Sequence, residues 1–199
     1  YLTRNTLGDG DKIIMSTDKD FLQLVNDNVK VWSPTRKKLY DKQSVLEEYF
    51  VTANNFIMAK VFEGDKSDNI NGVKGVATKT LVKNMPTLAN EDNTYTLDEV
   101  YKYALQHKDE GGAFFVKVLQ NKELLERNYK LMQLSDVDIS GSTKTKLLDI
   151  VRQPINRLIK FKFESQFMED RLFQNLPNIS SWLSQTFTTL DKYAQVTNG

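Results

Sequence analysis

Short apolar runs alternate with helical spacings over the first third of the chain. Residues 12–17 (KIIMST) predict a short buried strand, and residues 29–33 (VKVWS) predict a second one, followed by a turn at 34–37 and a hairpin arm at 38–40. Between the strands, residues 18–27 space their apolar side chains as an amphipathic helix. Ser44 and Glu47 form a capping-box pattern that starts another helix, and residues 54–65 predict a helix that stops at Gly64. This order of strands and helices predicts an α/β domain with a parallel sheet.

Strand signals disappear from about residue 64 onward. Gly72 and Gly75 interrupt the chain, and residues 77–85 (ATKTLVKNM) predict a helix that ends before Pro86. Helical spacing then continues over 97–107, 112–133, 142–153, 155–173 and 179–194. We therefore expect three parts: an α/β part over 1–63, a helical subdomain over 64–140 and a helical tail over 141–199.

Composition narrows the class of protein. A chain of 199 residues suits one domain, or one domain with a small subdomain. It has no cysteine, which excludes disulfides and cysteine-bound zinc, and its one histidine, His107, cannot build a histidine-rich metal site. No segment is long and apolar enough to span a bilayer, and no signal peptide opens the chain, so we expect a cytoplasmic location and no membrane partner.

Net charge is +1, but its distribution is uneven. Acidic residues recur in two close pairs, Asp18 with Asp20 and Asp65 with Asp68, and basic residues gather elsewhere. Asp18 and Asp20 follow the first predicted strand, where ligands of open α/β sheets gather, and residues two apart in extended backbone point to one side. Taken alone, this pair is better explained as a helix N-cap and a first-turn acid. Asp65 and Asp68 lie three apart, which places them on one face of a helix, with capping after Gly64 as the alternative.

Four acids in two such pairs would repel one another in one cleft unless cations neutralised them. Carboxylates suit Mg²⁺ or Mn²⁺, and two such ions about 4 Å apart can stabilise the attacking and leaving oxygens of a phosphodiester. Glycosidases also use paired acids, but the aromatic platforms typical of sugar sites are not adjacent here. Asp18, Asp20, Asp65 and Asp68 are therefore the candidate metal ligands and catalytic residues.

The stretch at 71–80 (NGVKGVATKT) predicts a turn followed by a helix start. Gly72 and Gly75 permit close backbone approach to a ligand, and a helix N-terminus offers N–H groups to phosphate. Basic and hydroxyl side chains surround this bend, and those that are candidate phosphate contacts are Lys74, Thr78, Lys79, Thr80 and Lys83. The alternative is an ordinary turn beside a solvated lysine face, and the Walker spacing of a P-loop is absent.

Together, three stretches resemble the structure-specific 5′-nucleases, a family that includes flap endonucleases, the 5′-nuclease domain of bacterial DNA polymerase I and phage 5′-exonucleases. They are residues 16–25 (STDKDFLQLV), 31–34 (VWSP) and 64–80 (GDKSDNINGVKGVATKT). Residues 121–135 (NKELLERNYKLMQLS) are similar to a segment that follows the hairpin in phage members, so the resemblance covers about 12–135. The phage ribonuclease H type is the most similar, and the tail after residue 140 matches no known segment.

The resemblance implies the end of a PIN-like nuclease domain with a parallel sheet, followed by a helical region with a helix–three-turn–helix DNA-binding motif. It implies two Mg²⁺ ions, with Mn²⁺ as an alternative. Asp20, Asp65 and Asp68 would surround one ion, and Asp18 would lean towards the other. It also implies a K⁺ ion bound by the backbone carbonyls of residues 73 and 76, here Val73 and Val76.

This chain departs from the family pattern in two respects. Residues 75–79 (GVATK) stand where family members commonly show Gly-Ile-Gly-Pro-Lys, and Asn71 and Lys74 replace common prolines. In family members the strand before the Asp18 position lies near mid-chain, behind earlier acidic motifs, whereas here it begins near residue 13. We therefore expect this chain to be the C-terminal portion of a nuclease.

The function that the resemblance implies is a metal-dependent 5′-3′ nuclease, a flap endonuclease or exonuclease that acts on branched or nicked duplex DNA and RNA–DNA hybrids. RNA primer removal in replication, or repair, is the expected process. A phage source and a host-cell cytoplasmic location are expected, and single-strand-binding or clamp proteins are the candidate protein partners. The alternative is a non-catalytic module that binds duplex DNA, because the N-terminal acidic motifs are absent.

Overall fold

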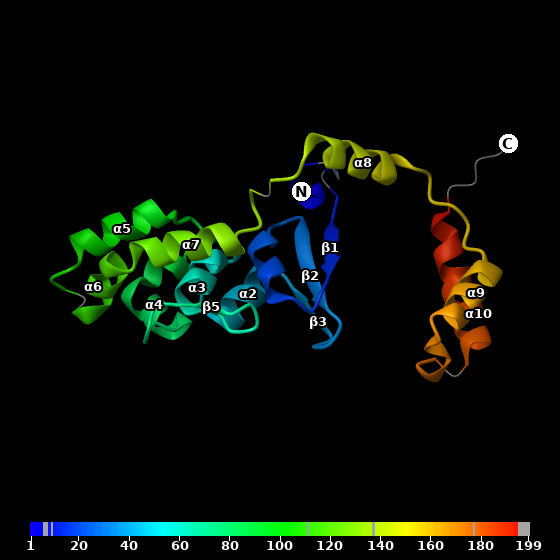
Figure 1. The fold of residues 1–199 in the computed structure, drawn as a ribbon, viewed down its shortest axis with the longest axis horizontal. Helices are drawn as coiled ribbons and strands as arrows, with labels where there is room; N and C mark the ends of the chain where they lie inside the picture. Colours follow the sequence, from blue (N-terminus) through cyan, green and yellow to red (C-terminus); the bar gives the residue numbers. More distant parts are fainter. Residues whose placement is uncertain (6–7, 9, 111, 137, 177, 195–199) are drawn as a thin grey trace. The chain divides into compact units, whose positions relative to one another are not determined.

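The computed structural model describes residues 1–199 except 6–7, 9, 111, 137, 177 and 195–199 (Figure 1). The chain forms two compact units, Tyr1–Asp138 and Ile139–Gly199. All of the candidate site residues lie in the first unit, which is mixed α/β with a small sheet.

A three-stranded sheet of order β1-β2-β3 opens the first unit, after the short helix α1 (Leu2–Asn5). β1 (Lys12–Met15) pairs in parallel with β2 (Val29–Ser33), and β2 pairs antiparallel with β3 (Lys38–Tyr40). Both expected strands and the hairpin arm are thus present. The expectation that the first strand is buried is wrong: Ile13 and Met15 are 62% and 72% exposed. In the described part of the chain, β1 is an edge strand whose Ile13–Met15 face is left uncovered.

Two predicted helices near the sheet differ in detail from the structure. The segment after β1 is a six-residue 3-10 helix, η1 (Lys19–Leu24), and not an amphipathic α-helix. The next helix, α2 (Lys42–Tyr49), begins earlier than expected, because Asp41 and not Ser44 is its N-cap. Ser44 takes the other half of that capping box by accepting a hydrogen bond from the Asp41 amide.

Helix α3 (Phe56–Glu63) follows the 3-10 turn η2 (Ala53–Asn55) and forms the centre of the unit. It ends at Gly64, as expected, where φ is +78°. Past this point the expected loss of strands is incorrect, since β4 (Gly64–Asp65) and β5 (Ile70–Asn71) form a two-stranded antiparallel hairpin.

A set of helices packs around α3 to complete the core of this unit, and α3 itself packs against α4 and α7. The elements are α4 (Thr78–Asn84), η3 (Pro86–Ala89), α5 (Leu97–Gln106), α6 (Ala113–Gln120) and α7 (Lys122–Met132). The single helical stretch expected over 112–133 is therefore two helices, broken at Asn121. The Asn121 side chain donates a hydrogen bond to the Lys117 carbonyl at the end of α6.

The second unit contains α8 (Gly141–Arg152), α9 (Lys160–Glu169), η4 (Leu172–Gln174), α10 (Ile179–Leu190) and η5 (Asp191–Tyr193). The helix expected over 155–173 begins only at Lys160. Helices α9 and α10 meet through Phe163, whose ring lies 5.4 Å from that of Trp182 and 5.6 Å from that of Phe187. Trp182 is therefore a packing residue of this unit. Of the helices in the described residues, none has both the length and the apolar content needed to cross a membrane.

Candidate metal centre and nucleic-acid cleft

The turn that follows β1 positions the first pair of acids. The Asp18 carboxylate caps η1 by accepting a hydrogen bond from the Asp20 amide at 2.8 Å. Asp20 occupies the first turn of η1 and is half-buried. The capping explanation therefore holds for Asp18, but it leaves the Asp20 carboxylate free to face away from η1.

The β4–β5 hairpin positions the second pair. Asp65 is the last residue of β4, and Asp68 lies in the turn that leads to β5, so the expected helical spacing of these two acids is wrong. Asp65 Oδ1 accepts a hydrogen bond from the Ser67 amide at 2.9 Å, which fixes the turn locally. The hairpin, and not a helix face, is what brings the two carboxylates to one side.

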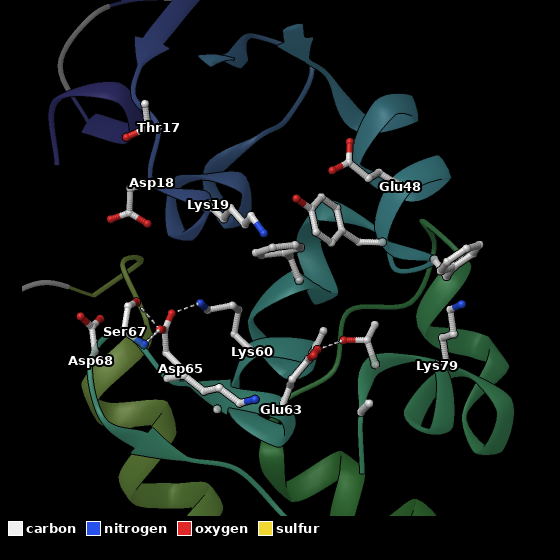
Figure 2. Close-up of a pocket in the computed structure, with 18 residues that line it drawn as sticks. Thr17, Asp18, Lys19, Glu48, Lys60, Glu63, Asp65, Ser67, Asp68 and Lys79 are labelled. Atoms are coloured by element: carbon white, nitrogen blue, oxygen red, sulfur yellow. Dashed lines mark hydrogen bonds and ion pairs between the residues drawn. The ribbon is translucent and has the colours of Figure 1, made fainter. Parts of the chain in front are cut away.

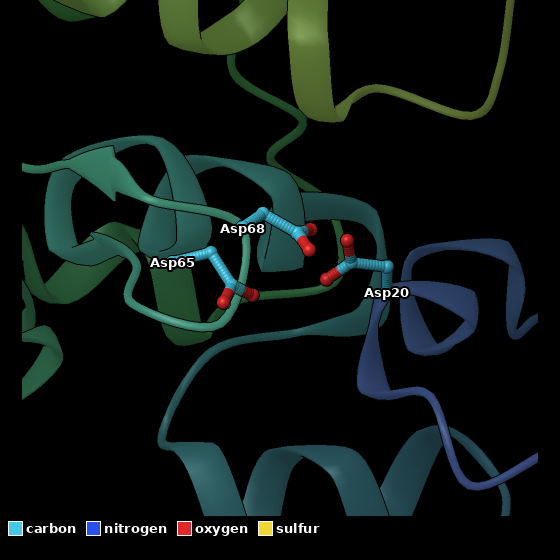
Figure 3. Close-up of side chains that lie close together, drawn as sticks. All are labelled: Asp20, Asp65 and Asp68. Atoms are coloured by element: carbon cyan, nitrogen blue, oxygen red, sulfur yellow. The ribbon is translucent and has the colours of Figure 1, made fainter.

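Three of the four predicted acids converge. Asp20, Asp65 and Asp68 each offer a carboxylate oxygen, and these atoms all lie within 4.8 Å of one another (Figure 3). Asp18 is outside this group, but it lines the same cleft as Asp65 and Asp68. Residues 45 positions apart in sequence are thus brought together because η1 and the start of the hairpin both lie against α3.

Lys60, on α3, lies among these acids and was not among the residues expected from sequence. Its ammonium makes an ion pair with Asp20 Oδ1 at 2.8 Å and donates a hydrogen bond to Asp65 Oδ2 (Figure 2). The contact with Asp20 has ion-pair distance but not hydrogen-bond geometry, so buried Asp20 Oδ1 has no hydrogen-bond partner in the described structure. The sequence signal was the one charged residue in the apolar run at 56–62.

The acids and Lys60 have shifted pKa values for different reasons. Burial raises the pKa of Asp20, although Lys60 opposes this effect. Hydrogen bonds from Lys60 and then Ser67 hold the pKa of Asp65 far below its usual value. Burial disfavours the charged form of Lys60, but its pairing with Asp20 and Asp65 outweighs this and raises its pKa.

A cleft of about 880 Å³ opens beside the acids. Both charge signs line it: acidic Asp18, Glu48, Glu63, Asp65 and Asp68, and basic Lys19, Lys60, Lys66 and Lys79. Figure 2 shows Asp18, Asp65 and Asp68 at one side of the view and Lys79 at the other. A polyanion in this cleft could therefore meet cations directly and approach the carboxylates where a metal ion neutralises them.

Two basic side chains of the β2–β3 hairpin, Arg36 and Lys38, are held by Glu48, which lines the cleft. Glu48 pairs with Arg36 and with Lys38, and it accepts a hydrogen bond from the Tyr40 hydroxyl at 2.9 Å. Burial works against the charged form of Glu48, but hydrogen bonds from Lys38, Tyr40 and Arg36 outweigh it and lower its pKa to about 2.

The residues predicted to contact DNA around the bend at 71–80 fall into two groups: some are exposed, and others already contact the protein itself. Lys74, Gly75, Lys79 and Lys83 are exposed. The Thr78 hydroxyl, in contrast, donates a hydrogen bond to Glu63. Gly72 packs against its own chain: a Cβ there would lie 2.3 Å from the Phe62 and Glu63 carbonyl oxygens. The lack of a side chain at Gly72 is therefore explained by the fold alone.

The side chains of Val73 and Val76 are buried, which leaves only their backbone groups for a ligand. The Val73 carbonyl accepts a hydrogen bond from the Val76 amide at 3.0 Å. Lys117, on α6, also reaches this bend, and its ammonium donates to the Lys74 carbonyl at 3.3 Å. Lys117 is a basic group at the bend that the sequence did not indicate.

Asn128, on α7, anchors the hairpin from behind. It is fully buried, and its side-chain amide donates to the carbonyls of Val61 at 3.0 Å and Asn71 at 2.9 Å. One side chain thereby ties α7 to both α3 and β5, the strand paired with the one that carries Asp65.

Known proteins of similar sequence identify the family of this chain. No protein-family model matches the chain. A 5′-3′ exonuclease of Aquifex aeolicus is 31% identical over 160 residues, covering 79% of this chain and 50% of the relative. A flap endonuclease Xni of Pseudoalteromonas translucida is 33% identical over 136 residues, covering 66% of this chain and 48% of the relative. These relatives place the chain in the 5′-nuclease family, the class of 5′-3′ exonucleases and flap endonucleases.

These matches cover only part of each relative. The chain spans about half the length of these curated relatives. Among solved structures, that of the T5 D15 protein co-crystallised with metal ions has a TM-score of 0.49 and 24% identity, covering 61% of this chain and 42% of that chain. A likeness of that size does not define the site of this chain, which depends on the geometry described above.

Proposed function

We propose that this chain is the metal-binding and duplex-holding part of a 5′-3′ nuclease that hydrolyses phosphodiesters near the 5′ end of branched or nicked duplexes. One observation supports the proposal above all: Asp20, Asp65 and Asp68 converge within 4.8 Å beside a cleft that also bears lysines. The family to which the relatives belong supplies the reaction class. Duplex DNA and RNA–DNA hybrids are the proposed substrates, and replication or repair, in the cytoplasm, is the proposed setting.

The three acids fit a hard divalent cation. All three donors are carboxylate oxygens, the ligands that Mg²⁺ and Mn²⁺ prefer. The buried oxygen Asp20 Oδ1 already attracts a positive charge, the Lys60 ammonium at 2.8 Å, so this position suits a cation. Such an ion would lower the pKa of a bound water and stabilise charge on the phosphate oxygens. Asp18, on the edge of the same cleft, is proposed as one ligand of a second ion, which needs further ligands besides it.

The chain's own residues would then hold and orient the substrate. Lys79 lines the cleft, and Lys83 lies one helical turn further along α4, so both can reach phosphates of one backbone. We propose that Lys74, Gly75 and Thr78 belong to the same helix–three-turn–helix motif and contact the duplex backbone. Gly72 would contribute by closing the bend. A K⁺ ion at the carbonyls of Val73 and Val76 belongs to this proposal as well.

The domain division is part of the proposal. Residues 1–63 would supply the core that carries Asp18 and Asp20, and residues 64–140 the hairpin and the duplex grip. Residues 141–199 would form the helical tail, and single-strand-binding or clamp proteins of replication are the proposed protein partners.

The test is cleavage of a 5′-flap duplex with and without Mg²⁺, together with duplex binding in the absence of Mg²⁺. We expect Asp65→Asn combined with Asp68→Asn to lose cleavage and to keep duplex binding, because the acids hold the metal and the lysines hold the DNA. The matched control is Asp92→Asn with Asp109→Asn, two exposed acids outside the cleft, which should change neither property. Cleavage that persisted in the Asp65 and Asp68 double variant would contradict the metal role.

A second candidate function is a duplex-binding module without catalysis. It is favoured by the single three-acid group in the described residues and by the chain's coverage of about half of its relatives. In the same assay, a wild-type chain that binds the flap duplex but never cleaves it, with Mg²⁺ or Mn²⁺ present, would support this alternative.

A further inference from the structure

Lys60 is held in an environment that a lysine rarely occupies without a partner. Its neighbours on α3, Met58, Ala59, Val61 and Phe62, are all buried, and its own side chain is only 16% exposed. Burial of an unpaired ammonium is unfavourable, so the position requires compensating negative charge. The structure supplies it from Asp20 and Asp65, which are two of the three acids that converge.

The ammonium contacts the oxygens that a metal ion would need. Lys60 Nζ lies 2.8 Å from Asp20 Oδ1 and also pairs with Asp65 Oδ2, as Figure 2 shows for Asp65. A divalent ion bound by the same two carboxylates would lie within about 4 Å of the ammonium if the ammonium stayed. Repulsion between charges of +1 and +2 at that distance, even in bulk water, corresponds to about a thirtyfold change in a dissociation constant.

We propose that Lys60 is a built-in counter-cation that competes with the divalent ion for Asp20 and Asp65, and so sets the metal concentration at which the site fills. This inference rests on the proposed function, because it assumes that these acids bind a metal. Lys60 is thus a positioning residue. Without metal, it keeps the η1 acid and the hairpin acid together despite their mutual repulsion, and when the metal binds, its ammonium leaves those oxygens.

A second consequence concerns ion selectivity. A monovalent ion is attracted to the two carboxylates no more strongly than the Lys60 ammonium that already contacts them. A divalent ion carries twice the charge, so its attraction to the same carboxylates is about twice as strong. Lys60 therefore makes the site select divalent over monovalent cations, and removing Lys60 should make Mn²⁺ binding more sensitive to added KCl.

The test is a Mn²⁺ titration of the full chain by calorimetry and by electron paramagnetic resonance, with no substrate present. Lys60→Met keeps the length and apolar stem of the side chain and removes its charge. We expect it to bind Mn²⁺ about tenfold to thirtyfold more tightly than wild type. The matched control is Lys66→Met, which removes an exposed lysine from the same cleft that makes no ion pair with the described acids. We expect its dissociation constant to change less than about threefold.

The direction of the change separates this role from a structural one. A lysine that only stabilised the hairpin would, when removed, weaken Mn²⁺ binding or leave it unchanged, and either result in a folded Lys60→Met variant overturns the inference. A wild-type chain that bound no Mn²⁺ would overturn the proposed metal site and this inference with it.

A measurement on the wild-type chain keeps the inference testable if Lys60→Met does not fold. Nuclear magnetic resonance of the lysine side-chain ammonium groups, followed during a Mg²⁺ titration, should show the Lys60 signal moving as the site fills. The Lys66 signal serves as the reference. A Lys60 signal that stayed fixed, while the amides of Asp65 and Asp68 reported Mg²⁺ binding, would overturn the inference.

Discussion

Asn128→Ala is the substitution that most sharply tests how the fold holds the acidic hairpin. The Asn128 side chain is fully buried and donates hydrogen bonds to the carbonyls of Val61 and Asn71. Its own carbonyl oxygen accepts from Arg127 at 3.1 Å. Alanine removes both donors and leaves the Asn71 carbonyl, on β5, without this partner.

The expected magnitude follows from those contacts. Each lost hydrogen bond from a buried side chain costs about 1–1.5 kcal/mol, and the small cavity left by the amide adds to this. We expect the free energy of unfolding to fall by about 2–4 kcal/mol. Because β5 pairs with β4, which carries Asp65, the hairpin should also open locally more often than in wild type.

Urea unfolding followed by circular dichroism measures the global loss, and amide hydrogen exchange of residues 64–71 measures the local one. Asn54→Ala is the matched control, since Asn54 is exposed, and its unfolding free energy should stay within about 0.5 kcal/mol of wild type. If Asn128→Ala lost less than about 1 kcal/mol and left hairpin exchange unchanged, the anchoring role given to Asn128 would be wrong.

Three further predictions concern the backbone, the acid stability and the DNA grip. Gly72→Ala should lower the free energy of unfolding by about 3 kcal/mol or more, because the added Cβ would lie 2.3 Å from the Glu63 carbonyl. Gly10→Ala is the control and should be nearly neutral in the same urea assay, since the space around Gly10 is open. Equal effects of the two substitutions would refute the packing argument. Glu48 has a folded pKa of about 2 against an ordinary value of 4.5, so its stabilisation is present above pH 4.5 and is lost as pH falls towards 2. Because its partners are partly exposed, we expect only about 1–2 kcal/mol, seen as a gap in unfolding free energy between wild type and Glu48→Gln that closes at low pH, and a constant gap would contradict this. Lys79→Ala should weaken duplex binding and lower its salt slope by about 1, and an unchanged slope would remove Lys79 from the interface.

Much of the fold follows from local pattern, and the failures have physical causes. The strands β1 and β2 and the end of α3 at Gly64 were predictable, since apolar runs and a glycine with positive φ are local signals. The β4–β5 hairpin was not predictable, because two-residue strands carry no periodicity and depend on Asn128, which lies 57 positions from Asn71. The exposure of β1 likewise depends on what packs against it and not on its own sequence.

The sequence indicated which acids are candidates for the site, but it did not indicate how they are arranged. Acid pairs are visible in sequence, and the resemblance to the 5′-nucleases implied that Asp20, Asp65 and Asp68 share one ion. The structure brings these three carboxylates within 4.8 Å of one another. The helical spacing assumed for Asp65 and Asp68 was wrong, although the turn between β4 and β5 brings them together all the same. Lys60 was missed because a single lysine in an apolar helix gives no indication of which distant acids it will meet.

The central claim is that Asp20, Asp65 and Asp68 together bind a divalent ion, and anomalous diffraction from crystals soaked in MnCl₂ tests it most directly. We predict a manganese peak within about 2.5 Å of a carboxylate oxygen of each of these three residues, with the Lys60 ammonium moved away from Asp20 and Asp65. Manganese bound elsewhere in the cleft, with Lys60 still bridging those two carboxylates, would contradict it.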